Sequence, residues 1–384
     1  MKKLPEGWKE VTLGEILEYE QPTDYIVGNE EYNDEYKTPV LTAGKSFILG
    51  YTNEKEGVYN KLPVIIFDDF TTASKYVTFP FKVKSSAMKL LTPKTNNVNL
   101  KYIFWLMQTI KVNSFSHKRY YLSKYQHIKI PLPPLSTQKK IVSILEKAEQ
   151  VKEWRKEVDT LTNDFLKAVF VEMFGDPGKN PKKWPIYKIE QVALDKKGSI
   201  RMGPFGSQLK KHELVKEGIK VLWIENIVDN KFNPEGTKYI TKEKYEQLKG
   251  FTVEPGDIII TMMGTIGRVE IVPDIGVSII SSHLLMIKVN MKLCNPIYLK
   301  TIIMSPFVQN QFKEASHGAI MSGLNGGIIK STKIILPPLH LQQKFASIVK
   351  EVEAMKEHQE HSKEQLDNLF NVLMQKAFKG ELVV

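Results

Sequence analysis

The chain has only one cysteine, Cys294, among its 384 residues. A single cysteine excludes an intramolecular disulfide and a multi-cysteine zinc site, and it fits a reducing compartment. Long apolar runs are lacking as well: the most apolar stretches, such as Ile258–Ile260 and Val277–Ile280, are far too short to span a membrane. No apolar stretch follows the basic pair at the N-terminus, so we expect no signal peptide and a cytoplasmic protein.

Motifs of catalysis and cofactor binding are also missing. The sequence contains neither the glycine-rich loop that cradles nucleotide phosphates nor the one that binds dinucleotides. Its eight histidines lack metal-ligand spacing, and the Ser-His pairs that begin at positions 116, 282 and 316 lack the surroundings of a nucleophile elbow. The stretch Asn295–Tyr298 is similar to an adenine methyltransferase motif but lacks its second proline, so we interpret Asn295 as a helix cap with Pro296 at the first helical position. These absences predict a chain with no catalytic residue, no metal site and no cofactor of its own.

One segment of the chain is written twice. Lys129–Leu135, followed by Gln138, recurs as Lys333–Leu339, followed by Gln342, with a Leu-Pro-Pro-Leu core in both copies. A repeat at this distance indicates an architecture of two half-units in tandem. After each copy a helical apolar pattern runs on for about ten turns.

The apolar residues after each Pro-Pro pair recur at spacings of three, four and seven, which is typical of coiled-coil seams. Each proline pair excludes helix before it, and Gly175 with Pro177 ends the first helix. Each helix of roughly 34 residues would be ~50 Å long. The predicted seam residues are Ile141, Leu145, Ala148, Val151, Val158, Leu161, Phe165 and Ala168 in the first helix, and Phe345, Ile348, Val352, Met355, Leu366, Leu369 and Leu373 in the second.

The rest of the chain predicts two bodies of mixed α/β structure. Short β-rich runs at 63–67 and 256–261 alternate with turns, and apolar segments at 102–107 and 297–303 are expected to form equivalent helices. The fold class is therefore two α+β bodies in tandem, joined by two long α-helices that form a coiled coil. The predicted domains are a first body at 1–135, a first helix at 136–176, a second body at 177–338 and a second helix at 339–384.

The net charge of +11 is unevenly distributed. Residues 1–135 carry 18 Lys and Arg against 14 Asp and Glu, and residues 177–335 carry 23 against 14. The two helical segments, 136–176 and 336–384, each carry a net charge of −1. All the excess positive charge thus lies on the bodies, which suggests a polyanionic partner, with nucleic acid first.

Cations, tyrosines, hydroxyls and glycines gather in a few segments that could contact phosphates and base edges. From Lys101 to Leu135 there are six basic residues and no acidic one, and Ser316–Lys330 is its glycine-rich counterpart in the second body. Taken alone, each segment is better interpreted as an ordinary surface loop, but the equivalent placement of this pair before both proline pairs favours a binding role. The candidate DNA-binding residues are Lys75, Lys118, Arg119, Tyr120, Tyr121 and Lys124 in the first body, and Arg201, Ser207, Lys210, Lys211, Arg268 and Lys330 in the second.

A variable body, a Leu-Pro-Pro-Leu segment and a coiled-coil helix, all repeated, resemble the specificity subunit of type I restriction–modification systems. Stretches similar to that family's target-recognition domains are Phe67–Thr72, Ser85–Lys89, Gly203–Lys210 and Gly264–Arg268. The resemblance covers nearly the whole chain.

The resemblance implies a non-catalytic subunit in which each body reads one half of a split, asymmetric sequence in double-stranded DNA. It implies that the helices pack antiparallel as a spacer and dock two methyltransferase subunits together with endonuclease/translocase subunits. S-adenosylmethionine, ATP and Mg²⁺ would be bound only by those partners. The alternatives are a stand-alone DNA-binding protein and a methyltransferase or nuclease whose site is not apparent.

Overall fold

The computed structural model describes residues 4–44, 46–111, 119–228, 231–317 and 324–382. By its internal contacts the chain divides into two units: the first combines residues 1–158 with 359–384, and the second holds residues 159–358. Each unit thus contains one body together with the start of one long helix and the end of the other. The predicted domains separate helices from bodies, whereas the contacts join each body to its parts of the helices.

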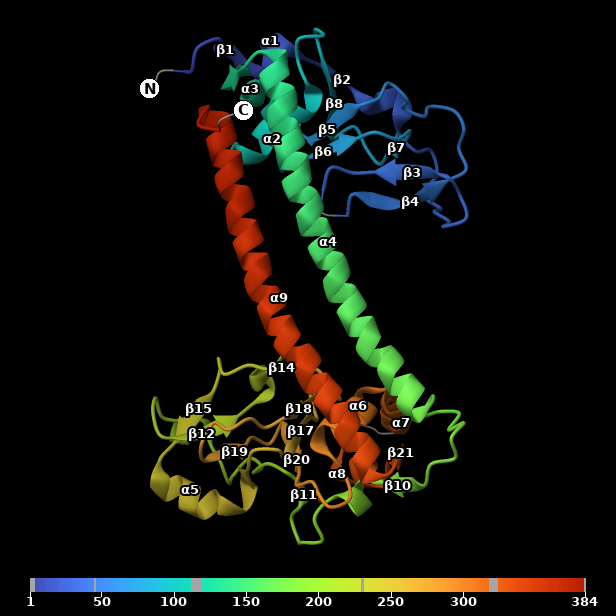
Figure 1. Cartoon of the computed structure of the whole chain (residues 1–384), viewed down its shortest axis with the longest axis vertical. Helices are drawn as coiled ribbons and strands as arrows, with labels where there is room; N and C mark the ends of the chain where they lie inside the picture. Colours follow the sequence, from blue (N-terminus) through green and yellow to red (C-terminus); the bar gives the residue numbers. More distant parts are fainter. Residues whose placement is uncertain (1–3, 45, 112–118, 229–230, 318–323, 383–384) are drawn as a thin grey trace. The chain divides into compact units, whose positions relative to one another are not determined.

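In the first unit, three groups of paired strands lie in the body (Figure 1). The strands are β1 (Lys9–Thr12), β2 (Leu17–Glu20), β3 (Thr38–Leu41), β4 (Ile48–Thr52), β5 (Val64–Asp68), β6 (Ser74–Val77), β7 (Lys82–Val83), β8 (Met88–Pro93) and β9 (Lys129–Leu132). The helices are α1 (Leu13–Ile16), η1 (Pro22–Tyr25), α2 (Leu100–Thr109), α3 (Tyr120–Ser123), η2 (Tyr125–His127) and the start of α4 (Leu135–Phe174).

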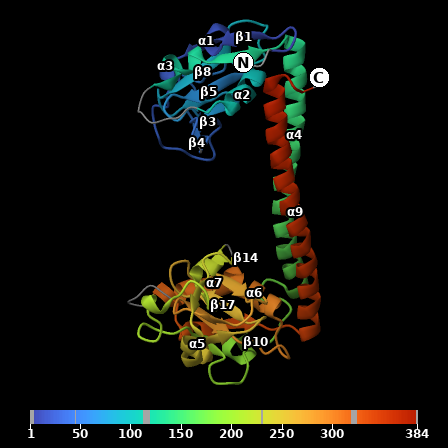
Figure 2. The same ribbon diagram turned by 90° about the vertical axis from the view of Figure 1, so that its left-hand side faces the viewer.

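The main sheet of this body has the order β2–β8–β5–β6, with antiparallel neighbours throughout. A smaller sheet pairs β3 with β4 in antiparallel and with β7 in parallel orientation, and β1 pairs with β9. Helix α2 lies between the main sheet and the long helices (Figure 2). Its Ile103 and Leu106 belong to a buried cluster that joins Ile65 of β5 to Leu145 of α4 and Met374 of α9 (Leu339–Lys379).

The second unit has more and shorter strands. They are β10 (Ile186–Lys188), β11 (Ile200–Met202), β12 (Ile219–Leu222), β13 (Ile227–Val228), β14 (Lys231–Phe232), β15 (Lys238–Ile240), β16 (Thr252–Val253), β17 (Ile258–Thr261), β18 (Val269–Ile271), β19 (Ser278–Ile280), β20 (Leu284–Ile287) and β21 (Lys333–Ile335). The helices are η3 (Ile189–Val192), η4 (Lys211–Glu213), η5 (Ile224–Asn226), α5 (Lys242–Leu248), η6 (Lys249–Phe251), α6 (Pro296–Met304), α7 (Pro306–His317), α8 (Gly326–Ser331) and the start of α9.

The sheets of the second body repeat those of the first. The order β11–β20–β17–β18 is again antiparallel throughout and matches β2–β8–β5–β6 strand for strand. Strand β12 pairs with β15 in antiparallel and with β19 in parallel orientation, as β3 does with β4 and β7, and β10–β21 corresponds to β1–β9. The two bodies therefore share one fold, although their sequences differ almost everywhere.

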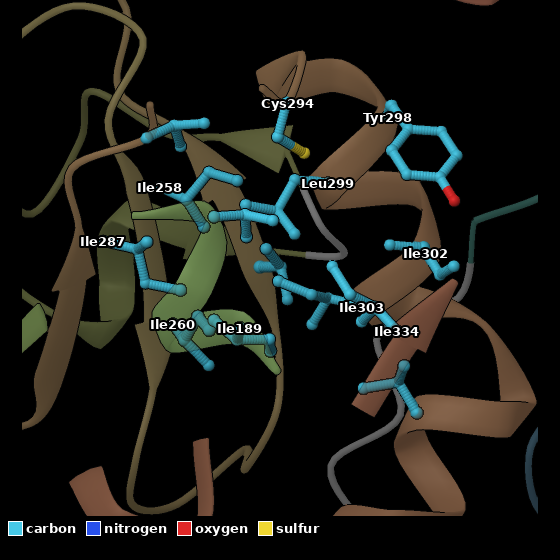
Figure 3. Close-up of a cluster of buried hydrophobic side chains, with 14 of the residues drawn as sticks. Ile189, Ile258, Ile260, Ile287, Cys294, Tyr298, Leu299, Ile302, Ile303 and Ile334 are labelled. Atoms are coloured by element: carbon cyan, nitrogen blue, oxygen red, sulfur yellow. The ribbon is translucent and has the colours of Figure 1, made fainter. Parts of the chain in front are cut away.

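The largest core of the second unit lies between its main sheet and α6. Leu299 and Ile303 of α6 face Ile258 and Ile260 of β17, and each of these four side chains is fully buried (Figure 3). Asn295 caps α6 through the amide of Ile297, with the proline at the first helical position. The predicted cap is confirmed, and the helices expected at 102–107 and 297–303 are α2 and α6.

The long helices begin directly after the two proline pairs, and α4 ends at Phe174, as the sequence predicts. In the first unit the start of α4 packs against the end of α9, where Ile141 and Leu145 share a core with Ala377. In the second unit the end of α4 packs against the start of α9, where the rings of Phe174 and Phe345 lie 5.5 Å apart. The helices run antiparallel within each unit.

The predicted seam is wrong in the middle of both helices. Val151, Val158, Leu161 and Phe165 of α4 are between 38% and 59% exposed. On α9, Met355 and Leu369 are each 54% exposed. Only the outer seam residues of each helix, such as Leu145 and Phe345, are buried as expected.

Polar contacts take the place of the expected seam. In the first unit, the Lys152 ammonium lies 2.7 Å from Oδ1 of Asp367 and 4.7 Å from the ring centroid of Phe370. The hydrogen bond from this ammonium holds the pKa of the Asp367 carboxyl below its usual range. In the second unit, Lys356 Nζ donates to Asn163 Oδ1 at 2.6 Å.

Candidate nucleic-acid interface

Two of the segments that resemble target-recognition domains occupy the same place in the two bodies. Turn 1, residues 68–73, joins β5 to β6, and turn 2, residues 261–268, joins β17 to β18. Near the start of each turn, a backbone amide donates to the carbonyl of the residue just before the neighbouring strand. Asp69 N donates to Ala87 O, before β8, at 3.0 Å, and Met262 N donates to His283 O, before β20, at 2.9 Å. The topology thus aligns two loops that share no sequence.

Turn 1 is organised by the side chain of Asp68. Its Oδ1 accepts hydrogen bonds from the amides of Phe70 and Thr71 at 2.8 and 2.9 Å. Thr72, the residue after Thr71, has a φ of 61°, in the left-handed region that β-branched residues rarely adopt. The surrounding hydrogen bonds therefore hold the turn in one shape despite a locally unfavourable backbone.

A buried ion pair ties turn 1 to its neighbours. Lys89 Nζ of β8 lies 3.1 Å from Oδ2 of Asp69, and both side chains are at most 2% exposed. The backbone carbonyl of Asp69 accepts from Tyr120 N, and its Oδ1 accepts from Tyr121 N at 2.8 Å. Asp69 consequently fixes the start of α3, where Arg119 stands exposed, beside the turn.

Turn 2 is organised by Thr261. Its hydroxyl donates to the carbonyl of Thr265 and accepts from the amide of Arg268, and the backbone amide of Gly267 donates to its carbonyl. Arg268 itself donates from Nη1 to the carbonyl of Ile227 at 3.3 Å. A polar side chain at the end of the strand thus shapes the turn in both bodies, aspartate in one and threonine in the other.

The structure separates the candidates of the first body. Arg119 and Lys124 are exposed on either side of α3, and Lys75 is half-buried in β6 with its ammonium 5.8 Å from the ring centroid of Phe47. Lys118 lies outside the described residues.

Tyr120 and Tyr121 are not surface residues. Each is 1% exposed, and the ring of Tyr121 packs 5.7 Å from that of Phe67 in the core. Burial also raises the pKa of the Tyr121 phenol above its ordinary value. The prediction that these two side chains line a DNA-contacting surface is wrong, because α3 turns them inward while Arg119 and Lys124 stay outside.

In the second body, the candidates lie on strand β11, on two loops and on helix α8. Ser207, Lys210 and Lys211 are exposed on the loop after β11, Arg268 ends turn 2, and Lys330 is exposed on α8. The guanidinium of Arg201 is committed to the protein: Nη1 donates to the carbonyl of Gly250 at 3.0 Å, and the group stacks 4.0 Å from the Phe251 ring centroid. Arg201 therefore ties the end of β11, where this loop begins, to Gly250 and Phe251.

Large apolar side chains on the two turns escaped the sequence analysis. Phe70 on turn 1 is 44% exposed, and Met263 and Ile266 on turn 2 are 47% and 39% exposed. Exposed apolar groups on otherwise polar turns can contact thymine methyl groups or base faces. The sequence signal that could have identified these side chains is a large apolar residue flanked by Asp, Thr or Gly.

The middle of α4 carries a second surface of five residues, four of which were predicted to lie inside a coiled coil; Trp154 was not among those. In the first unit it consists of Val151, Trp154 and Val158, of which Trp154 is 59% exposed. In the second unit Leu161 and Phe165 are 59% and 52% exposed. We call these five residues the α4 stripe, since they recur at spacings of three and four on one helix. Exposed apolar rows of this kind mark interaction sites.

Within the described ranges, no three His, Cys, Asp or Glu residues lie together as metal ligands would. Nor does any helix of the described part of the chain have the length and apolar character needed to cross a bilayer.

The sequence profile described as "Type I restriction modification DNA specificity domain" matches residues 5–158 and 181–368. The chain belongs to this family. The two matched ranges each contain one body, so the family's domain occurs twice, as the shared sheet order indicates.

Named relatives agree with this assignment. The chain is 52% identical over 147 residues to the Type I restriction enzyme EcoR124I/EcoR124II specificity subunit of Escherichia coli, an alignment that covers 35% of this chain and 36% of that protein. It is 22% identical over 411 residues to the MjaVIII specificity subunit of Methanocaldococcus jannaschii, covering 100% of this chain and 94% of the relative.

Solved structures share the fold. The S subunit of a type I system from M. genitalium has a TM-score of 0.58 at 13% identity, with 98% of each chain covered. A chain from a study of complex assembly and conformational transition of the type I R-M system has a TM-score of 0.62 at 18% identity, with 100% of each chain covered.

Proposed function

We propose that this specificity subunit reads a split, asymmetric sequence in double-stranded DNA, one half with each body, and performs no catalysis itself. The observation that carries the proposal is the equivalence of turn 1 and turn 2. One fold presents two loops of unrelated sequence at the same place, so the same scaffold can address two different half-sites. Base edges in the major groove distinguish all four base pairs, and side chains on such loops can read them.

The charge distribution supports the same division of labour. The excess Lys and Arg residues lie on the two bodies, while the helical segments are nearly neutral. Lysines and arginines that contact phosphates supply affinity and register, whereas contacts with base edges supply specificity. We assign phosphate contacts to the exposed Lys124, Lys210, Lys211 and Lys330, and base contacts to Arg119 and Arg268.

The long helices are suited to act as the ruler between the half-sites. Helix α4 has 40 residues and α9 has 41. At 1.5 Å per residue each extends ~60 Å, longer than the ~34–36 Å between the centres of half-sites one DNA turn apart. A helix of this length can hold two recognition bodies at a fixed separation.

The α4 stripe is assigned to helices of the methyltransferase subunits, two of which would bind per chain. An exposed row of Trp, Leu, Phe and Val at coiled-coil spacing is complementary to the apolar face of another helix. The related structure from the study of type I R-M complex assembly supports partners of this class. S-adenosylmethionine, ATP and Mg²⁺ then bind to the methyltransferase and endonuclease/translocase subunits.

The proposal is tested with the chain co-purified with its methyltransferase subunits. The complex is incubated with a random-sequence duplex library, and the bound DNA is sequenced. We expect two short specific blocks separated by a fixed number of unread base pairs. A single continuous block would contradict bipartite reading, and binding of labelled S-adenosylmethionine to the isolated chain would contradict the non-catalytic assignment.

A further inference from the structure

Each body is fastened to its long helix by the same set of hydrogen bonds around one buried glutamine. Gln138 is 1% exposed and Gln342 is fully buried, both in the first turn of a long helix. The glutamine is the third residue after each Leu-Pro-Pro-Leu segment in the repeat. Its polar side chain inside the protein calls for an explanation, because buried amides are costly unless fully hydrogen-bonded.

In the first unit the amide of Gln138 is satisfied by three backbone groups. Its Oε1 accepts from Asn99 N at 2.8 Å, and its Nε2 donates to the carbonyls of Asn97 at 3.0 Å and Pro133 at 2.8 Å. Asn99 in turn caps α2 through the amides of Lys101 and Tyr102. One side chain thereby connects the start of α2, the proline pair and the start of α4.

The second unit repeats this arrangement bond for bond. Gln342 Oε1 accepts from Asn295 N at 2.8 Å, and Nε2 donates to the carbonyls of Leu293 at 3.3 Å and Pro337 at 2.7 Å. Asn295 caps α6 as Asn99 caps α2. The equivalence is maintained even though the residues two positions before the caps differ, Asn97 in one unit and Leu293 in the other, because only their backbone is used.

A tyrosine completes each set. Tyr102 Oη donates to the carbonyl of Pro131 at 2.9 Å, and Tyr298 Oη donates to the carbonyl of Ile335 at 2.7 Å. These carbonyls belong to β9 and β21, the strands that lead into the proline pairs. We call the glutamine, the capping asparagine and the tyrosine of each unit its joint: Gln138, Asn99 and Tyr102 in joint 1, and Gln342, Asn295 and Tyr298 in joint 2.

We infer that Gln138 and Gln342 are positioning residues that fix the direction in which each body leaves its long helix and so set the permitted spacing between half-sites. The inference rests on the proposed function. Apolar packing resists separation of α2 from α4 but permits sliding, because it has no preferred direction. Three directional bonds to one buried amide select a single orientation, and breaking them leaves backbone groups unpaired.

The geometric demand is strict. One added base pair moves a half-site by ~3.4 Å along the DNA axis and rotates it by about 35°, for a repeat of 10–10.5 base pairs. A body held rigidly at its joint cannot follow that rotation, whereas a body with a loosened joint can. Loss of a joint should therefore relax spacing without changing which bases are read.

The test compares Gln342→Met with Gln343→Met in the full chain, co-expressed with its methyltransferase subunits. Gln342→Met keeps the length and shape of the side chain but removes all three bonds, whereas Gln343, the adjacent glutamine, is exposed and serves as the matched control. The readout is enrichment from a duplex library that carries the two wild-type half-sites at spacings from two base pairs below to two above the preferred one.

We expect wild type and Gln343→Met to prefer one spacing by about tenfold or more, and Gln342→Met to prefer it by about threefold or less, with unchanged bases in each half-site. Gln138→Met should relax spacing in the same way from the other joint. If Gln342→Met fails to fold, Tyr298→Phe takes its place. It removes one bond of joint 2, so its preference for one spacing should lie between about threefold and tenfold.

The outcomes separate the two claims. If wild type selects no split site, the proposed function fails and the inference falls with it. If wild type selects a split site and the folded joint variants lose thermal stability but retain the wild-type spacing profile, the joints only stabilise the fold and the inference alone is overturned.

Discussion

At the scale of single residues, the two bodies use polar side chains to shape turns and leave one arginine beside each. Arg119 is exposed at the start of α3, next to turn 1, and Arg268 ends turn 2. We propose that each guanidinium contacts a base edge, which for Arg268 means exchanging its hydrogen bond to the Ile227 carbonyl for one to the base. A bidentate contact with guanine is the commonest specific contact in the major groove.

We predict that Arg119→Ala and Arg268→Ala each relax one half-site only. Loss of a bidentate base contact costs about 1–3 kcal/mol, or roughly 5- to 150-fold in discrimination at that position. The measurement is selection from a random duplex library by each variant complex. Equal loss at both half-sites would show that the substitution destabilises the chain rather than removing a base contact.

The buried Asp69–Lys89 pair makes a prediction about stability. Removing one partner of a buried ion pair costs about 3–5 kcal/mol, since it leaves an uncompensated charge, whereas removing both costs less. Lys89→Met should therefore greatly reduce the hydrogen-exchange protection of β5 and β8. The double variant Asp69→Asn/Lys89→Met, which keeps the side-chain oxygen that accepts from Tyr121 N, should regain part of that protection. Equal losses in the two variants would contradict the account.

At the scale of elements, the sequence predicted where the helices lie better than which faces they use. The proline pairs, the glycine after Phe174 and the Asn295 cap act locally, so the starts of both long helices, the end of α4 and the cap are confirmed. The expected length of roughly 34 residues is wrong, because α4 has 40 residues and α9 has 41. Which residues of a helix form the seam depends on which face of that helix packs against the other helix. In a helix of 3.6 residues per turn, Val158 is about 100° around the axis from Ile141, so one list of apolar spacings combined two different faces.

The proposed recognition residues were predictable only as segments. The stretches 67–72 and 264–268 were both identified. Their equivalence follows from the strand pairing, and it could not be seen in the sequence because the two bodies have little sequence similarity. Tyr120 and Tyr121 were misassigned because a tyrosine close to lysines in the sequence can lie either on a DNA-binding surface or in the core. Only the orientation of α3, fixed by Asp69, decides between these environments.

The α4 stripe predicts a specific binding defect. Tryptophan side chains at the centre of an interface commonly contribute 2 kcal/mol or more, so Trp154→Ala should weaken methyltransferase binding by about 30-fold. Val171→Ala is the control, because Val171 is 53% exposed on α4 but outside the stripe. The measurement is the affinity of the purified subunits; equal affinities for the two variants would exclude the stripe as the docking surface.

The ruler role of the helices is tested by shortening both within the first unit. Deleting 153–156 from α4 and 363–366 from α9 removes about one helical turn next to the Lys152–Asp367 contact and largely preserves the helix faces. Because the deletion also removes Trp154 of the α4 stripe, Trp154→Ala in helices of full length is the control. Each helix becomes ~6 Å shorter, so the preferred spacing should fall by about two base pairs. An unchanged spacing in a folded, DNA-binding variant would refute the ruler.

At the scale of the whole chain, one domain fold is used twice with two sets of surface loops. The family profile matches both halves, and the main sheets, the joints and the two turns correspond, while the second body adds β16 and the β13–β14 pair. The repeated parts are those that hold the bodies to the helices, and the parts that differ are the exposed loops. Duplication of a scaffold with divergence of its loops is what an asymmetric two-part target requires.

The most direct test of this account is methylome sequencing of cells with and without the chain, in a host that carries its methyltransferase subunits. The account predicts one split motif, with two unlike halves at a single spacing, that is methylated only when the chain is present. Methylation of a continuous motif, or of the same motif without the chain, would contradict it.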